Sequence, residues 1–113
     1  MPRSPGRGEI WHVDLEPTKG REQRGKRYVF ILSPEAHNRR GMVIALPISQ
    51  GSTLARGTGY ASTLMGAGTR TQGVVICDQP RTLDFAVRSA KYVERVPEVV
   101  VADVLSRLNP LVA

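Results

Sequence analysis

A polar segment between two strand-like segments is the feature that most constrains the fold. Residues 16–27 contain one apolar side chain, that of Pro17, whereas the flanking segments 10–15 and 28–32 are rich in residues that favour strands. The segment's cations and acids cannot be buried together away from water. It must therefore be a surface loop between two strands, in which Gly20 and Gly25 allow the positive φ angles that tight turns require.

The charge of this loop has two interpretations. The first is an ordinary hairpin loop that is kept solvated by its charges. The second is an anion site, because the cations outnumber the acids, are mostly arginines and surround Glu22. The whole chain carries a net charge of +6, and 13 of its 16 cations are arginines, which bind phosphate through two parallel hydrogen bonds. This bias favours a phosphodiester backbone over a membrane surface, since no segment has a basic amphipathic face.

The length of 113 residues predicts a single domain over residues 1–113, with residues 1–8 as a flexible arm because they include two prolines and two glycines. No run approaches the roughly 20 apolar residues of a spanning helix, and the N-terminus lacks the apolar core of a signal peptide. Cys77 is the only cysteine, which predicts a cytoplasmic protein with Cys77 as a buried filler. His12 and His37 belong to no Cys/His cluster, so we expect no metal site and no cofactor.

Short β-like segments separated by loops rich in glycine, serine and threonine make up most of the chain. Residues 9–15 alternate between apolar and polar, which predicts a strand with one buried side. Residues 28–32 are continuously apolar, as in a strand covered on both faces. In the strand predicted over residues 42–48, Pro47 indicates an edge or a bulge. Further short strands are expected within residues 60–64, 73–78 and 82–93.

Helical signals occur at two places. Ser33, Pro34 and Glu35 are typical of an N-cap, a first helical position and an acidic first turn, so they predict a short helical turn to about Asn38. Near the C-terminus, apolar residues fall at helical spacing and predict an amphipathic helix that opens near residues 96–98; they are Val101, Val104, Leu105, Leu108 and Val112. The chain is therefore expected to be mainly β, a compact barrel with a docked C-terminal helix.

Asp78 follows the strand expected over residues 73–78 and has two interpretations. It caps the turn that follows, or it is an acid–base group placed at a strand end, and the sequence does not favour either. The glycines at residues 57–60 and 66–73 do not form a phosphate-binding P-loop, because the Gly-Lys-Ser/Thr ending is missing. His12 is expected to be a packed or edge histidine rather than a catalyst.

Five motifs occur in an order that resembles the MazF/PemK (Kid) ribonuclease toxins. The first is G-E-I-W-x-V-x-L-x-P-T-x-G-x-E-Q-x-G at residues 8–25, followed by Arg27. The others are P-I-S-Q-G at 47–51, A-R at 55–56, G-V-V-x-C-D-Q-P-R-T at 73–82 and E-R-V-P-E at 94–98. The match runs essentially from Gly8 to the C-terminus, and five motifs in the right order make the resemblance specific although no single motif is decisive.

The resemblance implies an SH3-like barrel of the CcdB/PemK kind with a C-terminal helix, a homodimer, and sequence-specific cleavage of single-stranded RNA that inhibits translation. It also implies neutralisation by a cognate antitoxin. The net positive charge further predicts that this antitoxin has an acidic, disordered tail. Because the ribose 2′-hydroxyl is the nucleophile in such cleavage, the endoribonuclease is expected to be metal-independent and to leave a 2′,3′-cyclic phosphate and a 5′-hydroxyl.

The chain departs from the family at three positions. Family members usually have Arg-Pro at the end of the first loop, where this chain has Arg27-Tyr28. PemK-type members carry a histidine at the position of Arg21 and an arginine at the position of Ile76, and both are linked to catalysis in that branch. Other branches rely on an arginine matching Arg27 and a hydroxyl residue matching Ser49, and this chain has both.

Four residues are assigned to catalysis on this basis. Arg27 would stabilise the charge of the phosphorane and act as the candidate proton donor, with Arg21 assisting. Glu22 or Asp78 would be the base, and Ser49 would bind a phosphate oxygen or orient the ribose. The residues expected to bind RNA are Arg21, Gln23, Lys26, Gln50, Arg56, Arg70, Gln79 and Arg81.

Two rival functions remain at the level of sequence. A non-catalytic gyrase poison of the CcdB kind would share the barrel, but such toxins depend on a C-terminal tail with a tryptophan. This chain ends Asn-Pro-Leu-Val-Ala, and its only tryptophan is Trp11 on a predicted strand, which argues against that rival. An RNA-binding module with a degenerate active site is the other rival, and the departures at Arg21 and Ile76 keep it open.

Overall fold

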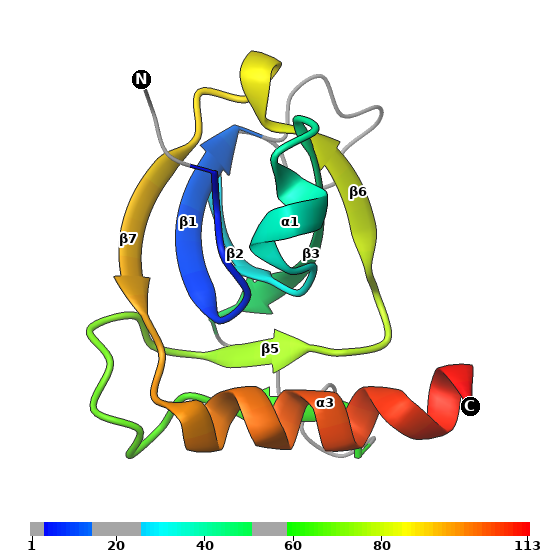
Figure 1. Ribbon diagram of the computed structural model, residues 1–113. Helices are drawn as coiled ribbons and strands as arrows, with labels where there is room; N and C mark the ends of the chain where they lie inside the picture. The colour runs from blue at the N-terminus through cyan, green and yellow to red at the C-terminus, as the bar shows by residue number, and fades with distance from the viewer. Residues whose placement is uncertain (1–3, 15–25, 51–58) are drawn as a thin grey trace, which may run out of the picture.

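Antiparallel strands form the body of the molecule, and a long helix lies along one side (Figure 1). The structure, a computed structural model, describes residues 4–14, 26–50 and 59–113. The strands are β1 (Glu9–Asp14), β2 (Lys26–Ile31), β3 (Met42–Ser49), β4 (Ala61–Thr63), β5 (Val74–Ile76), β6 (Arg81–Asp84) and β7 (Lys91–Arg95). The helices are α1 (Glu35–Asn38), the 3-10 turn η1 (Phe85–Val87) and α3 (Glu98–Val112).

The strand β3 is the centre of the sheet. The described strands pair in the order β4-β5-β3-β2-β1-β7, and β6 pairs with β3 as well. Pro47 is the last residue of β3 that pairs with β2, opposite Val29, and from Ile48 onward β3 pairs with β5. Of the two expectations for Pro47, an edge strand or a bulge, the first is wrong, because β3 pairs with β2, β5 and β6. Pro47 instead lies where β3 passes from one part of the sheet to the other.

The sheet separates two groups of buried side chains. Trp11 and Val13 of β1 face the group that we call the barrel core, which also holds Val29, Ile31, Val43, Ala45 and Leu83. Ile10 of β1 faces the group that we call the helix core, with Phe30, Leu46, Ile48, Leu64, Val75, Cys77, Val96, Val100, Val101 and Val104. The prediction of one buried side for this strand is thus wrong in its first half. Both faces are covered there because α3 adds a second layer, which strand periodicity alone cannot reveal.

Helix α3 is docked by an apolar face and by a polar contact. It lies beneath β5 in Figure 1, and Val100, Val101 and Val104 are buried in the helix core. The Ser62 hydroxyl of β4 donates to an Asp103 carboxylate oxygen at 2.5 Å. Arg107 donates to the same carboxylate oxygen at 2.9 Å and to the Gly59 carbonyl at 2.9 Å. The hydrogen bond from Ser62 and the Arg107 guanidinium lower the pKa of Asp103 despite its partial burial.

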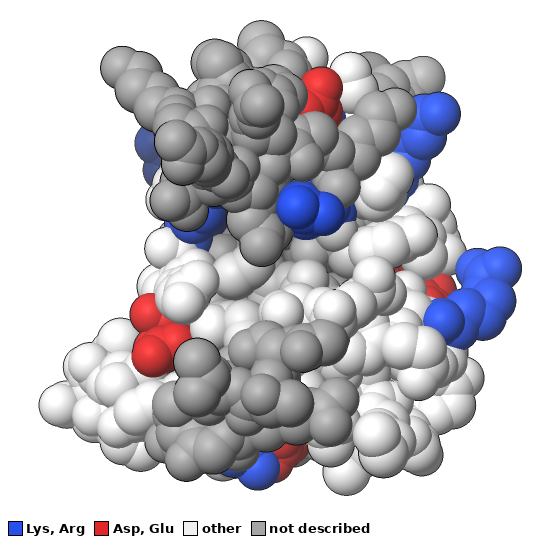
Figure 2. Space-filling model, turned by 180° about the vertical axis from the view of Figure 1, so that it is seen from behind, with Lys and Arg blue, Asp and Glu red and all other residues white. Residues whose placement is uncertain are grey.

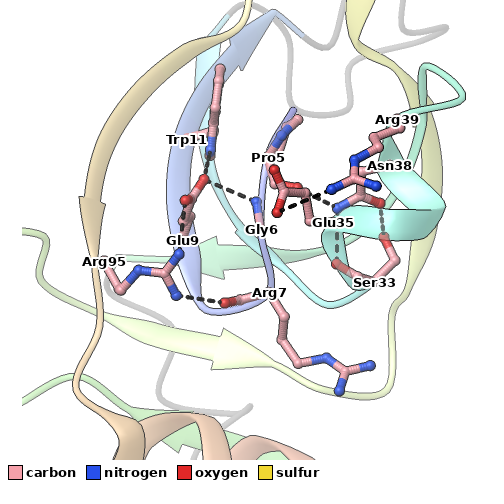
Figure 3. Close-up of polar contacts among 10 residues, drawn as sticks. All are labelled: Pro5, Gly6, Arg7, Glu9, Trp11, Ser33, Glu35, Asn38, Arg39 and Arg95. Atoms are coloured by element: carbon pink, nitrogen blue, oxygen red, sulfur yellow. Dashed lines mark hydrogen bonds and ion pairs between the residues drawn. The ribbon is translucent and has the colours of Figure 1, made fainter. Parts of the chain in front are cut away.

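The predicted helical turn is present, but Ser33 does not cap it. Pro34 is the N-cap residue of α1 and no side chain caps the helix. The Ser33 hydroxyl instead contacts Asn38 Oδ1 and accepts a hydrogen bond from the Ile44 backbone nitrogen at 2.9 Å. Asn38 Nδ2 in turn donates to the Pro5 carbonyl at 2.8 Å (Figure 3).

Residues 4–8 are packed against the sheet, which differs from the flexible arm expected over residues 1–8. Pro5, Gly6 and Gly8 are buried, and the Glu9 carboxylate is buried with them. One oxygen of Glu9 accepts hydrogen bonds from the Gly6 nitrogen at 3.1 Å and from Trp11 Nε1 at 2.9 Å. The other pairs with Arg95 of β7 at 3.0 Å (Figure 3). A buried carboxylate with three donors holds this segment in place, a role that the amino-acid composition of the arm does not indicate.

Candidate functional site

Part of the predicted site lies outside the described residues. Arg21, Glu22, Gln23 and Arg56 belong to this part, and for Lys26 the structure describes the backbone alone. The remaining predicted residues lie on β2, at the end of β3, in the loop between β4 and β5, and on the turn between β5 and β6. The geometry that follows concerns Arg27, Ser49, Gln50, Arg70, Asp78, Gln79 and Arg81.

Arg27 lies on β2 opposite Val13 of β1, on the side of the sheet that faces the barrel core. Its side chain is partly buried, and Nε is fully buried without a hydrogen-bond partner among the described residues. A buried guanidinium nitrogen in this state has lost its hydration without compensation, which is costly. An anion that reached this nitrogen would supply the missing acceptor.

Ser49 ends β3 and is fixed by an unusually close neighbour. It pairs with Val74 of β5, and the residue before Val74 is Gly73, with φ +117°. A Cβ atom on Gly73 would come 2.4 Å from the Ser49 carbonyl oxygen and 3.2 Å from Cγ of Gln50. Only glycine lets the two backbones approach this closely. Within the described part of the chain, the Ser49 hydroxyl has no hydrogen-bond partner, and the residue is partly buried.

A second contact joins the same two loops. Gln50 Nε2 donates to the Gln72 carbonyl at 3.2 Å, and Gln72 Nε2 donates to the Thr69 carbonyl at 3.3 Å. The Thr69 hydroxyl donates to the Thr71 carbonyl at 2.8 Å. Ser49, Gln50 and Gln72 therefore form one corner, and the loop between β4 and β5 supports it.

Glu94 of β7 ties this loop to the sheet. Its carboxylate accepts hydrogen bonds from the backbone nitrogens of Arg70 at 3.0 Å and Thr71 at 2.7 Å, and from the Thr71 hydroxyl at 2.6 Å. Burial raises the pKa of Glu94, but the hydrogen bonds from Thr71 and Arg70 outweigh it and hold the pKa below its usual value. The Arg70 guanidinium donates to the Val93 carbonyl at 3.1 Å, so Arg70 is anchored on β7 while remaining exposed.

Asp78, Gln79 and Arg81 are all exposed and follow β5 closely. Arg81 begins β6, where it pairs with Ala45 of β3. The two residues before Asp78 are buried, Ile76 at 7% exposure and Cys77 at 0%. Burial raises the pKa of the Cys77 thiol to about 11, which agrees with its predicted role as a filler. The strand predicted over residues 73–78 ends at Ile76, so Asp78 lies two residues beyond β5, and no described residue forms a hydrogen bond with it.

One face of the molecule is hollowed. Figure 2 shows the molecule narrowing between an upper and a lower part, with mostly uncharged atoms in the hollow, Lys and Arg side chains above it and to its right, and Asp and Glu side chains at its lower left. Sequence reasoning missed Gly73, Gln72 and Glu94 as parts of the site. Glu94 lies in the E-R-V-P-E motif, but its role depends on a loop 23 residues away in sequence. Nothing in the sequence distinguishes Gly73 from an ordinary turn glycine.

Two further properties limit what the described residues can do. No described helix is long and apolar enough to cross a membrane. Among residues 4–14, 26–50 and 59–113, no three His, Cys, Asp or Glu side chains are gathered so that they could hold a metal ion.

Comparison with known proteins gives consistent matches over nearly the whole chain. Residues 6–112 match the model of a family described as PemK-like, MazF-like toxin of type II toxin-antitoxin system. The chain is 49% identical over 106 residues to Endoribonuclease PemK of Escherichia coli, covering 93% of this chain and 80% of that protein. It superimposes on MazF of Deinococcus radiodurans with a TM-score of 0.83 and 32% identity, covering 97% of both chains. A MazE-MazF structure from the same organism gives a TM-score of 0.84 at 32% identity, covering 97% of this chain and 96% of the other.

Proposed function

Because the chain belongs to the family of PemK-like and MazF-like toxins of type II toxin–antitoxin systems, we propose that it is an endoribonuclease toxin. Its substrate is single-stranded RNA, which it cleaves at specific sequences and thereby inhibits translation. The same assignment gives its place of action as the cytoplasm, where messenger RNA is translated. The similarity to Endoribonuclease PemK and the net charge of +6 both support RNA as the substrate.

One observation carries the assignment of the site. Arg27 presents a buried Nε that no described residue satisfies. In an endoribonuclease the missing acceptor is a non-bridging phosphate oxygen, whose negative charge grows in the transition state. A fixed guanidinium stabilises that charge without reorganisation at the moment of reaction.

The reaction proceeds by attack of the ribose 2′-oxygen on the adjacent phosphorus. A base, Glu22 or Asp78, takes the proton of the 2′-hydroxyl, and the bond from phosphorus to the 5′-oxygen breaks. The 5′-oxygen receives a proton, for which Arg27 is the candidate donor and Arg21 assists, and the products are a 2′,3′-cyclic phosphate and a 5′-hydroxyl. Ser49 binds a phosphate oxygen or orients the ribose. No external nucleophile is needed, so the cleavage is metal-independent.

RNA outside the reacting nucleotide is held by cations and amides. The residues assigned to this role are Arg21, Gln23, Lys26, Gln50, Arg56, Arg70, Gln79 and Arg81. Gln50 and Arg70 each use part of their hydrogen-bonding capacity within the protein, on Gln72 and Val93 respectively. Their remaining donors are directed by these contacts, which gives them a defined orientation toward a ligand.

The active form is a homodimer that a cognate antitoxin neutralises. Two copies of a chain with a net charge of +6 carry a formal charge of +12, which attracts RNA and an acidic, disordered antitoxin tail alike. The tail occupies the groove beside Arg27 and Arg81 and excludes RNA. A ternary complex that bound RNA at full affinity with saturating antitoxin would rule out this direct occlusion.

The test combines a modified substrate with a matched pair of variants. The protein should cleave a long RNA in EDTA, and it should not cleave a substrate with 2′-deoxyribose at the scissile step. Arg27→Ala should lower kcat on the order of 10²-fold or more. Arg39→Ala is the control, because Arg39 is an exposed arginine beside α1 that pairs with Glu35 at 3.9 Å.

The outcomes separate this proposal from the rival function, an RNA-binding module with a degenerate site. The rival is favoured by Ile76, which is buried and stands where the resemblance to PemK-type toxins implies an arginine. Such a module would bind RNA and leave it uncut in every condition. Equal kcat for wild type and Arg27→Ala would refute the role of Arg27, although cleavage itself would then still stand.

A further inference from the structure

Two aromatic side chains form a pair across the ladder between β1 and β2. His12 and Tyr28 are direct cross-strand partners, with ring centroids 4.7 Å apart and ring planes at 40°. Both side chains are partly exposed. On β7, the ladder partner of His12 is Lys91, which is exposed. The three residues therefore follow one another across neighbouring strands.

The pair lies on the face of the sheet that looks away from the barrel core. Successive side chains of a strand point to opposite faces, and Trp11, Val13 and Val29 fill the barrel core. Tyr28 instead packs against the margin of the helix core while part of its ring stays accessible. The Tyr28 ring is therefore fixed by packing and still partly accessible, and we call the pair of His12 and Tyr28 the platform.

The polar ends of the pair are not used within the described part of the protein. No described residue hydrogen-bonds the Tyr28 hydroxyl, and neither this oxygen nor a His12 nitrogen is among the buried atoms that lack a partner. Besides the strand pairing and the packing of Tyr28 on the helix core, the described residues give these side chains the ring contact between the two. Both rings thus offer a π-face and a polar tip to a ligand.

We propose that His12 and Tyr28 form a stacking subsite for an RNA base next to the scissile phosphate. This inference rests on the proposed function and adds to it a group that determines specificity. Nucleobases taken out of a helix stack on tyrosine and histidine rings, and their edges then hydrogen-bond to nearby polar groups. Lys91 adds a positive charge beside the platform, close enough to favour the RNA backbone.

The position of Tyr28 in the chain links the platform to the phosphate site. Tyr28 directly follows Arg27, and the two side chains point to opposite faces of β2. A single phosphate or a single base therefore cannot contact both Arg27 and Tyr28. An RNA strand that crosses the end of β2 can set its phosphate against Arg27 and an adjacent base against Tyr28, which is the splayed arrangement that in-line attack requires.

The subsite depends on Tyr28, a residue by which this chain departs from the pattern that the resemblance implies. The related toxins that the sequence resembles usually carry proline at the position of Tyr28, and proline has no aromatic face. Replacing proline by tyrosine next to an unchanged arginine leaves the charge stabilisation in place and changes the surface that a base meets. We therefore expect tyrosine at position 28 to change which RNA base is preferred and to leave the cleavage reaction itself unchanged.

The test uses a short RNA that contains the cleavage sequence, identified from the 5′ ends of cleaved long RNA, with 2′-deoxyribose at the scissile step. Its dissociation constant is measured by fluorescence anisotropy for wild type, Tyr28→Leu and Tyr28→Phe. We expect Tyr28→Leu to weaken binding about 10-fold, the effect of losing one base–aromatic stack, and Tyr28→Phe to bind nearly as wild type. Tyr92→Leu is the matched control, because Tyr92 is an exposed tyrosine that contacts Trp11 on the opposite face.

An abasic nucleotide identifies the base concerned. Removal of one particular base should cost wild type about 10-fold in affinity and should cost Tyr28→Leu almost nothing, because the contact is already lost. His12→Leu is a second variant with the same expectation, and it serves if Tyr28→Leu does not fold. Additive losses at every position, or unchanged binding in both variants, would overturn the stacking subsite.

Failure of the subsite and failure of the proposed function give different results. Wild type that neither binds nor cuts RNA contradicts the proposed function. Wild type that cuts RNA while Tyr28→Leu keeps the same affinity and the same cleavage sequence contradicts the subsite alone. A variant that weakens antitoxin binding and leaves RNA binding unchanged would assign the platform to the protein partner and also overturn the proposal.

Discussion

Replacing Gly73 by alanine tests how the fold positions Ser49. Gly73 has a φ of +117°, and an added Cβ would come 2.4 Å from the Ser49 carbonyl oxygen. The atom that it meets is backbone, which cannot rotate away as a long side chain can. The substitution must therefore either displace the end of β3 or break the pairing of β3 with β5.

The expected magnitude has two parts. Holding alanine at a positive φ costs about 1–3 kcal/mol. Forcing an extra carbon into a packed position adds about 1–3 kcal/mol. Gly66 separates these two terms, because it lies in the same loop with a φ of +77° and has open space where its Cβ would stand. Gly66→Ala should therefore show the first cost alone, and Gly73→Ala should show both.

Urea unfolding measures the stability of the two variants, and cleavage of the RNA substrate measures the consequence for the site. With a slope of about 2 kcal/mol per molar urea, the midpoint of Gly73→Ala should lie about 1 M below that of Gly66→Ala. Its kcat should fall on the order of 10-fold or more, since a small displacement of a positioned group is costly. Equal midpoints and equal kcat values for the two variants would refute the reasoning.

Three other perturbations follow from contacts outside β3. The pKa of Glu94 is lower in the folded protein than in a free glutamate, so its hydrogen bonds stabilise the fold above the ordinary glutamate pKa. This stabilisation is lost as the pH falls through the lower, folded pKa. Glu94→Gln should therefore reduce stability at pH 7 and make stability less dependent on pH on the acid side, as urea unfolding at several pH values would show. Cys77 is buried with a pKa of about 11, so iodoacetamide at neutral pH should label the unfolded protein and spare the native one, as mass spectrometry would show. Asp103→Asn should lower stability by on the order of 1 kcal/mol in the same urea assay, because it weakens the contacts of α3 with Ser62 and Arg107.

The sequence predicts the elements of this fold well where periodicity and helix signals are local. The strand at residues 9–14 and the helix at 98–112 follow from the pattern of apolar residues and from Pro97 and Glu98. The second strand is predicted over residues 28–32, but β2 spans Lys26–Ile31, so Lys26 and Arg27 lie on the strand and not in the loop where their charge placed them. The sequence does not predict which other strands or helices pack over a given strand. Ile10 is fully buried because α3 and the strands β4 and β5 cover a face that the alternation in β1 marks as polar.

The candidate site divides in the same way. Arg27 and Ser49 can be singled out from residue type and motif, because charge and hydroxyl chemistry are visible in the sequence. The role of Glu94 cannot, since it depends on Thr71, which meets it only after the loop between β4 and β5 folds back on β7. The pairing of His12 with Tyr28 likewise requires the register of β1 against β2, and a shift by one residue would send Tyr28 to the other face.

The burial of Ile76 decides where charge stabilisation must come from. The resemblance to PemK-type toxins implies an arginine at this position, two residues before Asp78. Here Ile76 is 7% exposed on β5, opposite Ala61 of β4, so this strand contributes packing and no cation. Asp78 is exposed beyond it, and Arg27 is the predicted catalytic arginine with a buried, unpaired nitrogen among the described residues. The resemblance to other branches of the family likewise implies a role for Arg27 together with the Ser49 hydroxyl. If the chain cleaves RNA, Arg27 is therefore expected to provide most of the charge stabilisation. Ile76→Arg should not raise kcat, because position 76 is buried and β5 would have to be distorted to bring the new guanidinium to the surface.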